Sequence, residues 1–69
     1  MHSSPPEYLR NIVRANTGPP QPDQLSEMRM KLIAVSHGSL SLDEFEHALQ
    51  TAVDAGLLVE DGDGYRLPG

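Results

Sequence analysis

The chain has 69 residues, a formal net charge of −5 from 5 basic and 10 acidic side chains, and an isoelectric point near 4.8. Apolar residues make up 38% and charged residues 22%, which is typical of one soluble globular domain rather than a disordered segment. No apolar run approaches the roughly 20 residues of a membrane-spanning helix, and the first residues lack the pattern of a secretory signal. We therefore expect a cytoplasmic protein. Without cysteine, disulfides, thiolate-bound zinc and a thiol nucleophile are all excluded.

The first expected helix covers about residues 5–16 and begins with a capping box. The Ser4 hydroxyl can accept from the amide of Glu7, and the Glu7 carboxylate can accept from the amide of Ser4. Proline occupies the first helical position, and Gly18 marks the end of the helix. The spacing predicts an apolar stripe of Tyr8, Leu9, Ile12 and Val13.

The second expected helix covers about residues 22–36. Acidic Asp23 and Glu27 lie in its first turn and basic Arg29 and Lys31 lie in its middle, an order of charges that suits the helix dipole. The apolar spacing predicts a buried stripe of Leu25, Met28, Leu32 and Val35, widened by Ile33.

The third expected helix covers about residues 42–55, between a second capping box at Ser41 and Glu44 and the helix-ending Gly56. A β-hairpin over about residues 57–67 follows, with its turn in an Asp-Gly-Asp-Gly segment. The buried stripe of the helix is predicted to consist of Leu42, Phe45, Ala48, Leu49, Ala52 and Val53.

Two registers of the hairpin are open. A three-residue loop pairs Val59 with Leu67 and Glu60 with Arg66, whereas a two-residue loop pairs Val59 with Arg66. We predict the three-residue loop, because it matches apolar with apolar side chains and acid with base. A lone hairpin is barely stable in water, so we expect it to pack on the helices. The predicted fold class is α+β and mostly helical, a three-helix bundle with a C-terminal two-stranded hairpin in a single domain over residues 1–69.

The stretch over about residues 23–67 resembles the winged helix-turn-helix family. The resemblance rests on Ser41-Leu42-Asp43-Glu44-Phe45, on the Ala55-Gly56-Leu57 break, and on the Gly/Asp-rich wing tip followed by Tyr65-Arg66-Leu67. Ser39-Leu40-Ser41 looks like the short extended piece that often precedes the second helix of that family. The resemblance implies a role in transcription or another DNA transaction.

The chain departs from the family in one respect. The family usually has two helices between the short extended piece and the wing, and this sequence has room for one. Either the segments Asp23–Ser36 and Leu42–Ala55 are themselves the helix-turn-helix pair, or one helix is missing.

The resemblance implies that the helix over 42–55 enters the DNA major groove, but its charges argue against that role. The helix contains no Lys or Arg, and carboxylates facing phosphate groups repel them. Three interpretations stay open: an ordinary solvated face, a docking site for a basic protein partner, or adaptation to a salt-rich cytoplasm. The candidate acidic face consists of Asp43, Glu44, Glu46, His47, Gln50 and Asp54.

Charge is divided unevenly along the chain. Residues 1–36 carry 4 basic and 3 acidic side chains, whereas residues 37–69 carry 1 basic and 7 acidic ones. If DNA is bound, the contact is therefore expected on the first two helices. The alternative is that the basic residues of these helices are ordinary solvated side chains. The candidate nucleic-acid contacts are Arg10, Arg14, Arg29, Lys31 and Arg66.

No catalytic, cofactor or metal site is expected, and no small-molecule substrate. His37 and His47 have no Cys or His neighbour at zinc-binding spacing. The segment Asp61-Gly62-Asp63-Gly64 is superficially similar to a calcium loop, but Tyr65 stands where a third oxygen ligand is needed, so it is predicted to be a turn.

Several apolar residues cannot all face one core. Met28 and Met30 point to different sides of a helix, and Leu57 and Leu58 point to opposite faces of a strand. We therefore expect self-association, or docking on a larger partner, through Met30 and one of the two leucines. The alternative is that Met30 fills a gap under the first helix.

Together these observations predict a small, non-enzymatic, winged-helix-like binding module. Its expected function is regulation of transcription or another DNA transaction through protein–protein contacts. A transcriptional regulator that binds DNA directly is the alternative, and a salt-adapted structural or assembly module is a further one.

Overall fold

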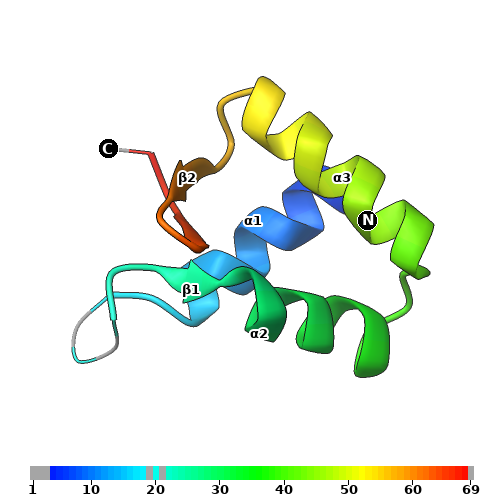
Figure 1. The fold of residues 1–69 in the computed structure, drawn as a ribbon, viewed down its shortest axis with the longest axis horizontal. Coiled ribbons are helices and arrows are strands. Elements are labelled where there is room, and N and C mark those ends of the chain that lie inside the picture. The colour runs from blue at the N-terminus through cyan, green and yellow to red at the C-terminus, as the bar shows by residue number, and fades with distance from the viewer. Residues whose placement is uncertain (1–3, 19, 21, 69) are drawn as a thin grey trace.

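A computed structural model describes residues 4–18, 20 and 22–68 (Figure 1). Residues 1–3, 19, 21 and 69 of the expected domain lie outside the described residues. Within the described residues the α+β class is confirmed, with three helices and a three-stranded antiparallel sheet that includes the C-terminal hairpin. The elements in chain order are α1 (Pro5–Ala15), β1 (Leu25–Ser26), α2 (Glu27–Lys31) continued by the π-helical turn η1 (Leu32–Ser36), α3 (Leu42–Asp54), β2 (Val59–Asp61) and β3 (Gly64–Arg66).

Both predicted capping boxes are confirmed. The amide of Ser4 donates to Oε1 of Glu7 at 3.1 Å, and the amide of Ser41 donates to Oε1 of Glu44 at 2.8 Å. In return each serine Oγ accepts from the amide of its glutamate. The backbone hydrogen bond stabilises the ionised carboxylate and holds the pKa of both glutamates below its usual value. The beginnings of α1 and α3 are thus fixed by local sequence.

The sequence predicted that the second helix begins near residue 22, but it begins at Glu27. Ser26 is its N-cap and accepts from the amide of Arg29 at 3.2 Å. Leu25 and Ser26, the two residues before this helix, form β1, in which Leu25 pairs with Tyr65. A two-residue strand is too short to leave a periodic signal in the sequence, so β1 was not expected. The short extended piece that the sequence suggested at residues 39–41 forms no strand, and the strand that lies before the hairpin in the chain is β1.

This later start changes which side of the second helix is buried. Met30 and Ala34 lie in the core, whereas Met28 is 79% exposed and Leu32 is 51% exposed. The predicted stripe was wrong at Met28 and Leu32 because it took its helical phase from Leu25, which is a strand residue. The π-helical turn η1 shifts the phase again by one residue per turn.

The hairpin turns over two residues, so the predicted three-residue loop is wrong. Val59 pairs with Arg66, and Glu60 pairs with Tyr65. Gly62 has a φ of +66° and no described non-glycine residue has a positive φ, which is typical of a type II′ turn with glycine first. Glycine at the first turn position lets Gly62 and Asp63 alone close the hairpin, and on the other side of β3 Tyr65 pairs with Leu25 of β1.

The core lies where α1, α3, the second helix and the sheet meet. In Figure 1, α1 lies between the α2 segment and α3, and the sheet closes one end of the three helices. The stripe of α1 is buried as predicted, apart from half-buried Tyr8, while Leu42 at the start of α3 is 48% exposed instead of buried. The buried apolar residues are Leu9, Ile12, Val13, Leu25, Met30, Ala34, Phe45, Ala48, Leu49, Ala52, Leu58 and Tyr65. Among residues 4–18, 20 and 22–68 we find no helix with the length and apolarity needed to cross a membrane.

Substituting Gly64 tests the close approach of β1 and β3. A Cβ added at Gly64 would lie 2.7 Å from the carbonyl oxygen of Leu25, a backbone atom that cannot move without displacing β1. We expect Gly64→Ala to lower the free energy of unfolding by about 1–3 kcal/mol, measured by chemical denaturation. The control is Asp63→Ala, an exposed turn residue that should change it by less than about 0.5 kcal/mol. Equal effects of the two variants would contradict this packing.

Substituting Ser41 tests the capping box of α3. Ser41→Ala removes the acceptor for the amide of Glu44 and should lower the melting temperature by ~4–8 °C, whereas Ser39→Ala, in the exposed connection, should not. Because the pKa of Glu44 is lowered on folding, its contribution is present in full above pH 4.5 and is lost as the pH falls through the folded-state value. Ser41→Ala keeps the backbone amide that holds this carboxylate, so the acid dependence is tested with Glu44→Gln, whose difference from the parent chain should shrink in acid. A difference that stays constant down to the acid transition would contradict this account.

Candidate functional site

The candidate acidic face is exposed along α3 and consists of Asp43, Glu44, Glu46, His47, Gln50 and Asp54. The structure places four of these residues on two different flanks of the helix. Glu46 and Gln50 line a hollow shared with the second helix and the hairpin. Glu44 and His47 line a different hollow, shared with the start of α1. The six residues therefore do not converge on one point.

Some of these side chains already have partners within the chain. Glu44 belongs to the capping box, and Nε2 of Gln50 donates to Oδ1 of Asp54 at 2.9 Å. Asp43 and Glu46 accept no hydrogen bond and form no ion pair within the described part of the chain. The described residues hold no group of three His, Asp or Glu side chains arranged to bind a metal ion.

A groove runs between the second helix, α3 and the hairpin. It consists of two hollows of about 310 and 470 Å³ that share Glu27, Lys31, Glu60 and Tyr65, and we call it the Tyr65 groove. The smaller hollow extends along α3 and includes Phe45, Glu46, Leu49, Gln50 and Val53. The larger hollow extends across the N-terminus of α2 to the hairpin turn and includes Ser26, Met28, Gly62 and Asp63.

The polar side of the Tyr65 groove carries more negative than positive charge. The Tyr65 hydroxyl donates to Oε1 of Glu27 at 3.2 Å. Burial raises the pKa of Tyr65 above its usual value, and the nearby carboxylates of Glu27 and Glu60 raise it further. Lys31 is the cation in both hollows, and it forms no ion pair within the described residues. The carboxylates of this groove thus remain largely uncompensated.

The basic candidates on the second helix do not act as one patch. Arg29 lines a hollow with Asn16, Gln24 and Leu25, whereas Lys31 lines the Tyr65 groove. Two residues apart on a helix, their side chains point to different flanks. The structure therefore separates the two cations that the sequence analysis had grouped.

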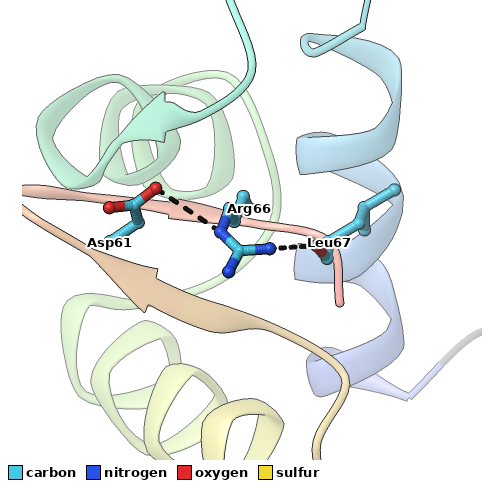
Figure 2. A network of polar contacts seen from close by, with 3 residues as sticks. All are labelled: Asp61, Arg66 and Leu67. Atoms are coloured by element: carbon cyan, nitrogen blue, oxygen red, sulfur yellow. Dashed lines mark hydrogen bonds and ion pairs between the residues drawn. The ribbon is translucent and has the colours of Figure 1, made fainter. Parts of the chain in front are cut away.

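Arg66 is held by the hairpin. Its Nε lies 3.4 Å from Oδ2 of Asp61, and its Nη1 donates to the carbonyl oxygen of Leu67 at 3.3 Å (Figure 2). An exposed pair of this kind adds little stability, but it offsets the charge that Arg66 would offer to phosphate.

The two arginines of α1 lie one turn apart. Arg14 is exposed, and its Nη2 donates to Oδ1 of Asn11 at 2.8 Å. Arg10 is half-buried, and its buried Nε has no hydrogen-bond partner among the described atoms. Because they are four positions apart, these two residues are the part of the basic set that shares one side of a helix.

The expected apolar contact surface is corrected by the structure. Met30 is 0% exposed and Leu58 is 1% exposed, so neither side chain offers surface to a partner, while Leu57 is half-buried. Met30 fills the core, which was the alternative interpretation. The large apolar side chains that are exposed among the described residues are Met28, Leu32 and Leu42.

The Tyr65 groove was not predicted from the sequence. Glu27, Glu60 and Tyr65 come from three separate segments and meet only because β3 pairs with both β1 and β2. The two-residue hairpin register, which sets Glu60 opposite Tyr65, was the signal that could have found it.

The chain was compared with protein-family models, curated proteins and solved structures, and no match was found in any of the three.

Titration of Tyr65 tests the electrostatics of the groove. In a Tyr8→Phe background, Glu27→Gln should lower the pKa of Tyr65 toward its usual value of about 10, because it removes a nearby negative charge. The measurement is tyrosinate absorbance against pH, with Asp43→Asn as the control that leaves the titration unchanged. Since folding raises this pKa, the stability contribution of the neutral hydroxyl is complete below about pH 10 and is lost as the pH rises further. Identical titration curves for Glu27→Gln and its background would contradict the assigned contact.

Proposed function

We propose that this chain is a non-enzymatic, winged-helix-like binding module that regulates transcription or another DNA transaction by docking a basic protein surface. The order helix, strand, helix, helix and hairpin supports the winged-helix interpretation, as does the strand order β1-β3-β2. In this interpretation the continuous α2–η1 segment and α3 are the helix-turn-helix pair, and β2 and β3 are the wing. This is the first of the two alternatives left open by the sequence.

The observation that carries the proposal is the charge of the surface that such a fold offers to DNA. Residues 32–65 include α3 and the hairpin turn, and they contain no Lys or Arg but 7 Asp and Glu residues. Neutralisation of phosphates supplies much of the affinity of DNA-binding proteins, and this surface would repel them. A basic protein surface is attracted by the same charges, which speed encounter and select the partner.

Binding to defined ligands tests the proposal. Fluorescence anisotropy compares a labelled Lys/Arg-rich peptide with a labelled DNA duplex over a range of salt concentrations. We expect the peptide to bind and the affinity to fall about threefold or more in Glu46→Lys. Asp23→Lys makes the same change of charge in the exposed segment before β1 and is the control, because it should have a smaller effect.

Direct DNA binding is the outcome that would overturn this proposal. Its signature is a Kd for the duplex tighter than about 1 μM that weakens steeply with salt and is lost in the Arg10→Ala/Arg14→Ala variant. That variant is chosen because these arginines remain together on α1.

A further inference from the structure

The larger hollow of the Tyr65 groove combines an exposed apolar side chain with carboxylates. Met28 is 79% exposed, the largest exposed fraction among the large apolar side chains described, and it lines the same hollow as Glu27, Glu60 and Asp63. Methionine is flexible and polarisable, so it adapts to differently shaped apolar partners. An apolar contact therefore lies directly beside a negatively charged one.

Tyr65 adds a second property to the same hollow. Its hydroxyl is held by Glu27, and both Glu27 and Glu60 act electrostatically on it. A guanidinium group can pair with carboxylates through its planar set of donors, whereas an ammonium group offers only a point charge. The surroundings of Tyr65 therefore favour arginine over lysine.

The geometry points to an occupant of one kind. We propose that the Tyr65 groove binds an unfolded segment of a partner protein in which an arginine is followed by an apolar residue. The arginine lies beside Tyr65 between the carboxylates, and the apolar residue packs on Met28. This inference rests on the proposed function and names the partner chemistry and the place where it binds.

Charge complementarity supports a basic segment over a nucleic acid. Glu27, Glu46, Glu60 and Asp63 line the groove, and Lys31 is its cation. Because Lys31 lines both hollows, it opposes an incoming arginine and weakens its binding. Removal of the exposed Lys31 should therefore strengthen binding. A residue that only stabilised the fold would not have this effect when removed.

The test uses the full chain and four synthetic ligands. The ligands are Gly/Ser peptides that carry repeated Arg-Leu, Lys-Leu or Arg-Ser pairs, and a DNA duplex. Affinity is measured by anisotropy, and the site is located by amide chemical-shift changes. We expect the Arg-Leu peptide to bind about threefold to tenfold more tightly than the other two peptides and to shift amides in residues 26–31 and 60–65.

Matched variants assign the contacts. Met28→Ser should weaken the Arg-Leu peptide about threefold to tenfold without affecting the Arg-Ser peptide, and Leu32→Ser is the control, an exposed apolar residue of the same helix outside the groove lining. Glu60→Gln should weaken both arginine peptides, whereas Asp43→Asn should not. Lys31→Ala should strengthen both. Melting temperatures check that each variant is folded.

The outcomes separate the two proposals. If basic peptides bind equally well to Met28→Ser, Glu60→Gln and the parent chain but more weakly to Asp43→Asn, the groove is overturned while docking of a basic partner stands. If no basic peptide binds, or the duplex binds more tightly and shifts the same amides, both proposals fail.

Discussion

The rest of the structure depends on the double pairing of β3. Tyr65 stands opposite Leu25 of β1 on one side and Glu60 of β2 on the other, and its ring is buried in the core. That one position ties the start of the second helix, the hairpin and the core together. With Tyr65 inward, Leu25 is extended, Ser26 becomes an N-cap, and the helix after it can begin only at Glu27. The close approach of Gly64 to the Leu25 carbonyl is the steric condition for this pairing.

What the sequence could predict was local. The capping boxes, the buried face of α1 and the glycine after α3 depend on residues a few positions apart, and the structure confirms them. The phase of the second helix depends on a contact between segments 40 residues apart, that of Leu25 with Tyr65. Matching of Val59 with Leu67 looked favourable from side-chain type, but Gly62 at a positive φ closes the turn over two residues and sets Val59 opposite Arg66.

The same distinction applies to the candidate site. The composition of the acidic face on α3 was readable from the sequence, because exposed positions of a helix follow its period. The division of this face between two flanks could not be predicted from the sequence. Glu46 lines a hollow with residues of the hairpin, whereas Glu44 lines one with the start of α1. Met28 and Met30 show the limit most clearly. The sequence indicated that one must be exposed, and only the true helix start decides which.

The strand order has a consequence for contacts between molecules. Since β3 is central, the free backbone edges of the described sheet belong to β1 with two residues and β2 with three. Exposed edges invite a strand from another chain, and short or charged edges discourage it. Here one edge ends after two residues, and the other carries exposed Glu60 and Asp61, so two copies that approach edge to edge would meet with like charges. The acidic hairpin thus protects a small sheet from intermolecular strand addition.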